Sequence, residues 1–322
     1  MPELPEVETT VNGLRRRIAG LKIVDAWSDY DSRYFRRSET IKDPSYFRRF
    51  KKEIMGRRVV SVERRAKNIL INLSGGATIL VHMKMTGHLL YGSYRFDAAA
   101  KKDPWVPIEP EGLRDPYNRR VHFMIGFDNG KKLALSDLRK FAKVAVLDTE
   151  LAHESIHLDG IGPEPLEKGF SLERFNARLD MKPNGKIKQV LLDQSVIAGI
   201  GNIYSDEALW RAGIHPLERV RYIAKPQRKK LYDAVRKTLA RGIDFGGDSM
   251  SDYRNVDGER GRFQEMHAAY RRTGMRCKKP GCGGVIERIK VGGRSAHFCS
   301  RHQVLIESGK KKAAGLSLGS KS

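Results

Sequence analysis

The sequence predicts an α+β protein in which an N-terminal helix precedes a two-sheet β-sandwich domain and a mainly helical region follows. Three observations carry this prediction. Apolar residues recur at three- and four-residue steps over residues 4–18. Short segments of alternating polarity follow up to about residue 136, and helical spacing returns after residue 165. A chain of 322 residues is long enough for two domains that each bury a core.

The first predicted helix places a chemically distinctive group at the start of the chain. Its apolar stripe consists of Leu4, Val7, Val11, Leu14 and Ile18. If Met1 is removed, the secondary amine of Pro2 becomes the N-terminus, and an α-amine has a pKa near ~7.8 against ~10.4 for lysine. Part of it is then unprotonated at pH 7 and could act as a nucleophile, with Glu3 and Glu6 as proton-transfer partners. The alternative is structural, because proline and early acidic residues also suit a helix start.

The β-sandwich is predicted from short β-branched segments separated by turn residues. Six of them are expected to be strands, at residues 22–27, 58–62, 69–73, 78–82, 122–127 and 132–136. Gly75-Gly76 and Asp128-Asn129-Gly130 fall between neighbouring segments and indicate hairpin turns. Residues 93–120 contain four prolines and are expected to form a loop insertion.

The charge of the chain indicates a polyanionic partner. The net charge is +23 and the isoelectric point is near 10.0, which favours nucleic acid first and an anionic membrane second. Residues 33–67 carry 13 Lys or Arg with aromatic residues between them, which suits either a nucleic-acid surface or a solvated basic face. The sequence has no apolar run of about 18 residues and no signal-peptide core, so we expect no membrane role and a cytoplasmic location.

The second half is predicted to be helical after a Gly- and Pro-rich linker at residues 160–165. Helices are expected at residues 172–179, 187–192, 203–212 and 227–241. The turn before the third of these contains Gly199 and Gly201, and Asn202 is expected as its N-cap. This helix–two-turn–helix unit would present backbone N–H groups to a phosphate, although such a turn can also simply reverse the chain. The tail from Ser308 is expected to be disordered and basic.

The three cysteines are clustered near the C-terminus and predict a metal site. Four residues separate the first pair, Cys277 and Cys282, and two residues separate the second pair, Cys299 and His302. Three thiolates and one imidazole suit tetrahedral Zn²⁺, with Gly292-Gly293 as the turn of a hairpin between the two pairs. No coordination position is left open, so one structural rather than catalytic zinc per chain is expected.

Taken in order, the Pro-Glu-Leu-Pro-Glu start, the helix–two-turn–helix unit and the zinc hairpin resemble the Fpg/Nei family of DNA glycosylase/AP lyases. The resemblance covers roughly residues 2–305, and the first ten residues are similar to the formamidopyrimidine-DNA glycosylase branch. It implies excision of oxidised purines from duplex DNA, such as 8-oxoguanine and formamidopyrimidines. It also implies cleavage of the abasic site by β,δ-elimination through an N-terminal proline Schiff base. A preference for oxidised pyrimidines is the neighbouring alternative, and a non-catalytic DNA- or RNA-binding protein is the alternative from another class.

The family resemblance also implies roles for individual residues. The catalytic positions would be Pro2, Glu3, Glu6 and Lys67. The side chains that fill the hole left by an extruded base would be Met85, Arg139 and Phe141. Asn202, Arg272 and Arg294 would contact DNA, and residues 249–263 would close over the base. The metal ligands would be Cys277, Cys282, Cys299 and His302, which depart from the family in the four-residue spacing of the first pair and in the histidine.

The resemblance further implies the domain plan and the partner. Residues 1–160 are expected to form the catalytic β-sandwich domain, 161–265 the helix–two-turn–helix domain, 266–307 the zinc-finger hairpin and 308–322 the tail. The expected partner is damaged double-stranded DNA, bound by a monomer that is associated with the nucleoid.

Overall fold

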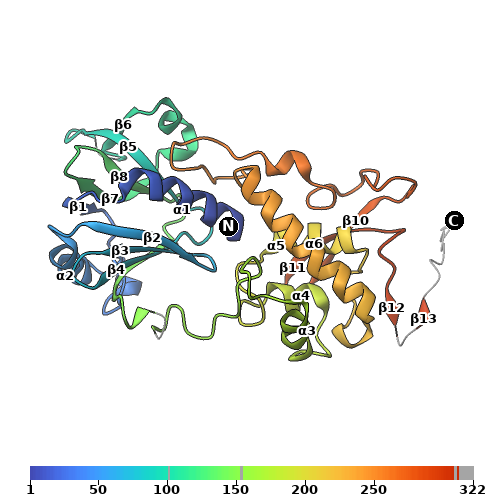
Figure 1. Ribbon diagram of the computed structural model, residues 1–322. Coiled ribbons are helices and arrows are strands. Elements are labelled where there is room, and N and C mark those ends of the chain that lie inside the picture. The colour runs from blue at the N-terminus through green and yellow to red at the C-terminus, as the bar shows by residue number, and fades with distance from the viewer. Residues whose placement is uncertain (101, 153–154, 308–309, 312–322) are drawn as a thin grey trace. The chain divides into compact units, whose positions relative to one another are not determined.

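The chain divides into two compact units, shown together in Figure 1. The computed structural model describes residues 1–100, 102–152, 155–307 and 310–311. The first unit contains residues 1–160 together with 241–265, and the second contains residues 161–240 together with 266–322. A segment from the second half of the sequence is therefore part of the first unit.

The first unit is built on two antiparallel sheets, which confirms the predicted α+β sandwich. The five-stranded sheet has the order β1-β7-β8-β5-β6 and the four-stranded sheet the order β2-β3-β4-β9. The strands of the first sheet are β1 (Ile23–Ser28), β5 (His88–Phe96), β6 (Trp105–Glu109), β7 (Val121–Phe127) and β8 (Lys132–Ser136). Those of the second are β2 (Val59–Arg65), β3 (Asn68–Leu73), β4 (Ala77–His82) and β9 (Lys143–Asp148). The sequence analysis did not predict β5, β6 or β9.

Two helices close the sides of the sandwich, as Figure 1 shows. Helix α1 (Leu4–Ile18) packs against β2 and β5, and its predicted apolar stripe is fully buried. Helix α2 (Pro44–Ile54) packs against the edge strands β1 and β9 after a short turn η1 (Arg33–Phe35). It buries Tyr46, Phe50 and Ile54, so part of the basic stretch is an amphipathic helix with its aromatic residues in the core.

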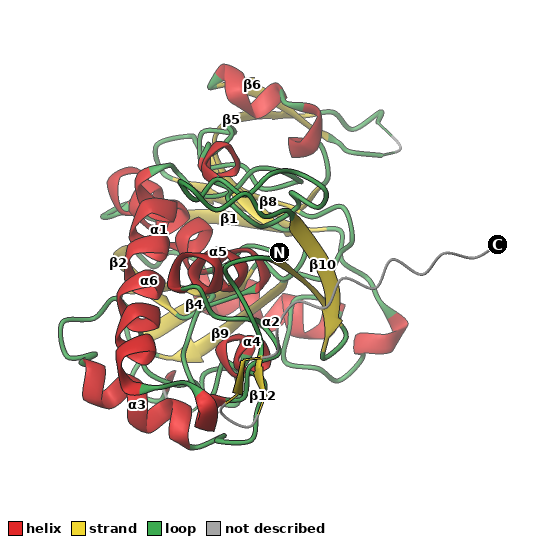
Figure 2. Ribbon diagram, turned by 90° about the vertical axis from the view of Figure 1, so that its right-hand side faces the viewer, coloured by secondary structure: helices red, strands yellow, loops and turns green. Residues whose placement is uncertain are grey.

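The expectation that residues 93–120 form a loop was wrong. Strand β5 extends to Phe96 and pairs with β6, and the 3-10 helices η2 (Glu111–Arg114) and η3 (Pro116–Asn118) follow (Figure 2). The prolines fit this structure because β6 is an edge strand, where a missing N–H is tolerated. Trp105 of β6 packs edge-on against Trp27 and Phe96, with ring centroids 5.7 and 4.9 Å away.

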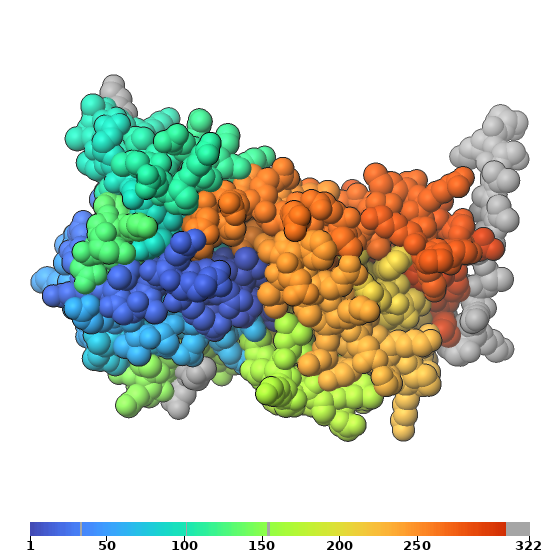
Figure 3. Space-filling model, turned by 45° about the horizontal axis from the view of Figure 1, so that its top comes forward, coloured from blue at the N-terminus to red at the C-terminus, as the bar shows by residue number. Residues whose placement is uncertain are grey.

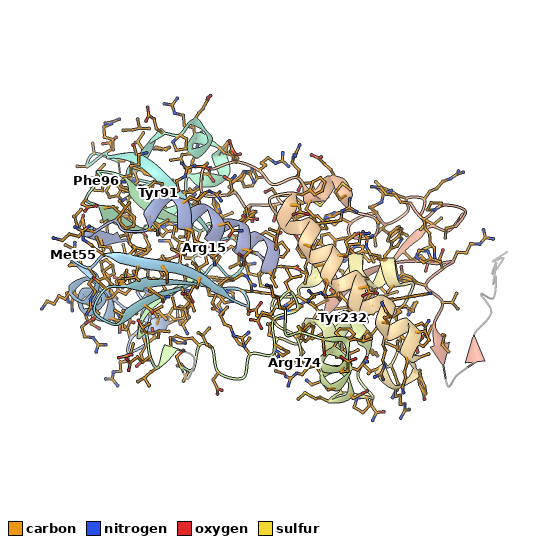
Figure 4. The ribbon with its side chains drawn as sticks, viewed as in Figure 1. Arg15, Met55, Tyr91, Phe96, Arg174 and Tyr232 are labelled. Atoms are coloured by element: carbon orange, nitrogen blue, oxygen red, sulfur yellow. The ribbon has the colours of Figure 1, made fainter. Side chains whose placement is uncertain are left out.

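The second unit contains the predicted helices and the hairpin. The helices are α3 (Leu172–Asp180), α4 (Ile187–Leu192), α5 (Asn202–Ala212) and α6 (Lys225–Asp244), with η5 (Val220–Tyr222) before α6 and η6 (Phe263–Met266) after it. The end of α6 from Arg241 and the first three residues of η6 belong to the first unit. Tyr232 on α6, labelled with Arg174 of α3 in Figure 4, donates to the Phe170 carbonyl at 2.7 Å. Strands β10 (Ile286–Val291) and β11 (Arg294–Cys299) form the hairpin, turned by Gly292 and Gly293 at positive φ.

The start of α5 and the C-terminal tail differ from the sequence predictions. Asn202 is not the N-cap of α5, because Gly201 holds that position in an extended conformation and Asn202 begins the helix. Most of the tail predicted to be disordered lies outside the described residues, and within it β13 (Lys310–Lys311) pairs with β12 (Ile306–Glu307). Among the described residues, we find no helix with the length and apolarity needed to span a bilayer.

Candidate active site and metal centre

The start of α1 buries two carboxyl groups beside Pro2. Glu3 and Glu6 are 2% and 1% exposed, and Pro2 is buried as well. The backbone N–H of Glu3 donates to Glu6 Oε2 at 2.7 Å as half of a reciprocal capping box. Buried carboxyl groups with such partners hold a fixed geometry. Three of the four predicted catalytic residues therefore lie together in one rigid turn.

A loop from later in the chain completes the surroundings of Glu6. The backbone N–H of Asp248 donates to Glu6 Oε1 at 2.7 Å, and the hydroxyl of Tyr253 donates to the Glu6 carbonyl at 3.0 Å. Burial is the main cause that raises the pKa of Tyr253, which keeps its phenol protonated as a donor. Gly247 is required here, because its φ is +83° and a Cβ would lie 2.9 Å from Glu6 Cγ.

The three predicted hole-filling residues lie on two turns that one hydrogen-bonded pair connects. Met85 follows β4 and Arg139 and Phe141 follow β8. The hydroxyl of Thr86 donates to the buried carboxylate of Asp137 and accepts from the backbone N–H of Arg139 at 3.1 Å. The sequence analysis missed Thr86 and Asp137, although their place beside the predicted residues could have indicated a supporting role.

The side chains of Arg139 and Phe141 are exposed and can contact a ligand. Phe141 is 47% exposed, and the guanidinium of Arg139 lies 4.4 Å from the centroid of its ring. Met85 is half-buried, whereas its neighbour Met83 is buried in the core. This exposure does not fit a purely structural role for Met85 and Phe141 in the sheet core.

A pocket of about 880 Å³ joins the N-terminus to these turns. Its walls include Met1, Met85 and Phe141 together with a group of basic side chains, Arg37, Lys42, Lys84, Lys143 and His157. Burial is the main cause that lowers the pKa values of Lys42 and Lys143, and the neighbouring lysines contribute. Positive charges held this close favour an anionic ligand.

Lys67, the fourth predicted catalytic residue, lies in the turn between β2 and β3. Its neighbour Ala66 has a φ of +54°, and the lysine itself is only 6% exposed. Burial, with help from Lys84 and Lys67, lowers the pKa of His82 to about 3. The neutral imidazole accepts from the backbone N–H of Lys84 at 3.0 Å, so Lys67 is at the same end of the sheet as the Met85 turn.

In the second unit, a buried ion pair supports the glycine turn that precedes α5. The ammonium of Lys188, fully buried in α4, donates to the Asn202 carbonyl at 3.0 Å and to Asp206 Oδ1 at 2.6 Å. The other oxygen of Asp206 accepts from the backbone N–H and Nδ1 of His297 at 3.0 and 2.8 Å. Asp206 thus joins the turn to the hairpin, and sequence spacing carries no sign of it.

The other residues predicted to contact DNA, Asn202, Arg272 and Arg294, also lie in the second unit. Glu207 accepts from the backbone N–H groups of Ala268, Ala269 and Tyr270 at 2.8–2.9 Å, which fixes the chain just before Arg272. Arg294 is exposed at the tip of the hairpin. The side-chain oxygen of Asn202 is buried and has no hydrogen-bond partner in the described part of the chain.

The predicted metal ligands converge on one point. The Sγ atoms of Cys277, Cys282 and Cys299 and a ring nitrogen of His302 all lie within 4.8 Å of one another. Three separations are 3.4–3.6 Å, from Cys282 Sγ to Cys299 Sγ and from Cys277 Sγ and Cys282 Sγ to His302 Nδ1. A tetrahedral metal with ligand bonds of about 2.1–2.3 Å has ligand–ligand edges of about 3.4–3.8 Å. The four residues can therefore hold a metal ion.

Helix α5 orients two of these ligands. His302 Nε2 donates to the carbonyl of Trp210 at 3.0 Å, which leaves Nδ1 as the acceptor toward the thiols. The indole N–H of Trp210 donates to Cys277 Sγ at 3.3 Å. Backbone N–H groups of Lys279 and Arg301 also point at thiol sulfurs, at 3.4 Å each. Donors of this kind stabilise thiolates.

Comparison with known proteins assigns the chain. Residues 1–144 match the model of the formamidopyrimidine-DNA glycosylase N-terminal domain, and residues 161–254 match that of the formamidopyrimidine-DNA glycosylase H2TH domain. The chain belongs to the formamidopyrimidine-DNA glycosylase family. It is 37% identical to the enzyme of that name from Heliobacterium modesticaldum over 94% of this chain and 100% of the relative, and 39% identical to that from Chloroflexus aggregans over 95% and 100%.

Solved structures of formamidopyrimidine-DNA glycosylases have the same fold. The Lactococcus lactis enzyme in complex with abasic-site DNA matches with a TM-score of 0.76 at 30% identity, over 92% of this chain and 97% of that one. A mutant of the same enzyme with Fapy-dG containing DNA also has a TM-score of 0.76 at 30% identity, over 92% and 98% of the two chains.

The buried ion pair generates a prediction about stability. We expect Lys188→Met to lower the free energy of unfolding by about 3–5 kcal/mol, because it leaves the buried carboxylate of Asp206 without its ammonium. Lys229→Met is the matched control, since Lys229 pairs with Asp233 on the surface and such pairs contribute about 0–1 kcal/mol. Urea unfolding of both variants measures the difference, and equal losses would contradict the role given to Lys188.

Proposed function

We propose that the chain is a base-excision repair enzyme that removes oxidised purines, such as 8-oxoguanine and formamidopyrimidines, from duplex DNA and then cleaves the abasic site. The observation that carries the proposal is the buried Pro2–Glu3–Glu6 turn, in a family whose named members are formamidopyrimidine-DNA glycosylases. The pocket beside it carries positive charge, as a DNA substrate requires.

The proposed chemistry begins with the amine of Pro2, which is released when Met1 is removed. Its nitrogen forms a bond to C1′ of the damaged nucleotide while the glycosidic bond breaks, and the base leaves with its bonding electrons and a proton. Glu3 is proposed as the acid that acts on the sugar. It protonates the ring oxygen O4′ as the C1′–O4′ bond breaks, and the Pro2 nitrogen, which has lost its own proton, supplies the electron pair for the C1′=N⁺ iminium. The iminium that forms acidifies the C2′ hydrogens, so loss of a proton expels the 3′ phosphate and a second elimination expels the 5′ phosphate. Glu6 holds the turn through its bond to the Glu3 backbone.

Extrusion of the damaged nucleotide opens a hole in the duplex that must be filled. Unstacking costs a few kcal/mol. Met85 and Phe141 are proposed to wedge into the stack, and Arg139 to hydrogen-bond the orphaned cytosine. The supporting observations are the exposure of Phe141, the contact between its ring and the guanidinium of Arg139, and the shared anchor at Thr86.

The remaining predicted residues are proposed to hold the DNA backbone. Lys67 would contact DNA beside the catalytic turn and assist catalysis there. Asn202 at the first turn of α5, Arg272 and Arg294 would contact phosphates, with the dipole of α5 adding to the attraction. The domain plan, the monomeric state and the cytoplasmic, nucleoid-associated location stay predictions.

The metal is proposed to be a single structural Zn²⁺. The three thiols and the imidazole are ligands that zinc prefers, and they occupy all four tetrahedral positions. His302 serves where a cysteine is usual in the family, and its hydrogen bond to the Trp210 carbonyl supports that assignment. The zinc would fix the base of the β10–β11 hairpin and thereby the position of Arg294.

Blocking the N-terminus tests the proposed nucleophile. We expect a version with an uncleaved N-terminal extension to lose borohydride trapping on 8-oxoguanine duplex, because Pro2 then has no free amine. The same extension at the C-terminus should leave trapping at the level of the untagged protein. Equal trapping by both tagged versions would contradict Pro2 as the nucleophile, and faster trapping on oxidised pyrimidines would contradict the proposed lesion class.

Replacing His302 tests the fourth ligand. We expect His302→Ala to weaken zinc binding by at least roughly tenfold in competition with a chelator, because one of four ligands is lost. Arg288→Gln on the same hairpin is the control, since Arg288 is exposed and its side chain contacts only Ser295 among the described hydrogen bonds. Metal analysis per mole of chain gives the stoichiometry. Unchanged zinc affinity in His302→Ala would contradict the proposal.

A further inference from the structure

The 3-10 segment of residues 111–118 is in direct contact with the loop of residues 247–261. The loop and the segment lie side by side in Figures 1 and 3. Their backbones approach so closely that a Cβ on Gly258 would lie 2.4 Å from the Gly112 carbonyl. The amide of Asn118 donates to the carbonyls of Gly112 and Gly258 at 2.9 and 3.3 Å and accepts from His88 Nε2 at 2.8 Å. Asn118 thus fastens both backbones to the sheet.

An ion pair between the buried side chain of Arg254 and the partly exposed carboxylate of Asp115 is the second link. The guanidinium of Arg254 donates to both carboxylate oxygens of Asp115, at 2.9 and 3.3 Å, and lies 4.6 Å from the ring centroid of Tyr117. Arg254 is 2% exposed, and it also donates to the backbone carbonyls of Ser251 and Tyr253. Burial alone would raise the pKa of Asp115, but the contact with Arg254 and the backbone N–H of Tyr117 together lower the pKa. One side chain therefore organises the loop and attaches it to the segment.

The same loop continues to the catalytic turn. Tyr253, next to Arg254, donates to the Glu6 carbonyl, and Asp248 donates to the Glu6 carboxyl group. The far side of the loop is attached to the sheet. The backbone N–H of Tyr91 in β5, a residue labelled in Figure 4, donates to the Val256 carbonyl at 2.7 Å. A displacement at Arg254 is thus transmitted over one residue to the surroundings of Glu6.

We propose that residues 111–118 are a buttress that holds the 247–261 loop in its closed position, and that Asp115 and Arg254 are positioning residues for the flipped base. This rests on the proposed function and on the family resemblance, which implies that residues 249–263 close over the extruded base. The buttress gives the 93–120 insertion a role. It acts on the excision step, which needs the base held, and much less on cleavage of an abasic site, which has no base.

Hydrogen exchange on the protein alone tests the buttress. We expect Asp115→Asn to speed exchange of the amides of residues 248–261 by roughly tenfold, since the loop loses its charged anchor. Asp103→Asn is the matched control, because Asp103 pairs with Arg120 in the same insertion but on the surface. Asp115→Glu keeps the carboxylate and should restore part of the protection. Equal exchange in Asp115→Asn and Asp103→Asn would overturn the buttress.

Kinetics test the positioning role. In single-turnover assays we expect Asp115→Asn and Arg254→Gln to slow release of 8-oxoguanine by roughly tenfold to a hundredfold, with cleavage of a preformed abasic site within about threefold of wild type. Equal losses on both substrates would overturn a role toward the base. If the wild type acts on neither substrate, the proposed function fails, whereas the exchange comparison still decides whether the buttress exists.

Discussion

A buried carboxyl group, that of Glu6, is the constraint on which the geometry of the first unit depends. One of its oxygens fixes the backbone of Glu3 next to Pro2, and the other fixes Asp248 in a loop that follows 242 residues later. Burying such a group without partners would be costly, so both contacts must form together. The turn at residues 2–6 and the loop are therefore joined through the one side chain of Glu6. Gly247 follows from the same constraint, because no larger residue fits beside Glu6.

In the second unit, too, buried carboxylates connect segments that are distant in the sequence. Asp206 and Glu207 are adjacent in α5 and are nearly inaccessible to solvent. Their carboxylate oxygens accept hydrogen bonds from different segments of the chain. Asp206 joins Lys188 to the hairpin through His297, and Glu207 holds the backbone before Arg272. Trp210, one turn later, orients Cys277 and His302. A single helix thereby connects the glycine turn before α5, the four candidate metal ligands and the segments that carry Arg272 and Arg294.

Residue patterns over short stretches of sequence predicted part of the fold and of the candidate site. The stripe from Leu4 to Ile18 predicted α1 because a buried helix needs that spacing, and the clustered cysteines predicted a metal site because their ligand atoms are close in sequence. Helix α2 was missed because its Lys and Arg obscured a narrow buried face. The strand β6 was missed because four prolines suggested a loop, although an edge strand tolerates them.

The remaining contacts have no local signal at all. Asp115 and Arg254 are 139 residues apart, and Asp206 and His297 are 91 apart. Only the folded chain brings such pairs together, so spacing cannot predict them. The family resemblance named Met85 rather than Met83, and the structure accounts for the difference, because Met83 is in the core while Met85 lines the pocket.

The proposed chemistry depends most on the covalent bond that the amine of Pro2 forms to the damaged nucleotide. The most direct measurement is to trap the protein with borohydride on 8-oxoguanine duplex, digest the adduct and identify the modified residue by mass spectrometry. We expect a peptide that begins at Pro2, lacks Met1 and carries the sugar on its N-terminal nitrogen. A sugar on Lys67 or another lysine, with Pro2 unmodified, would contradict it.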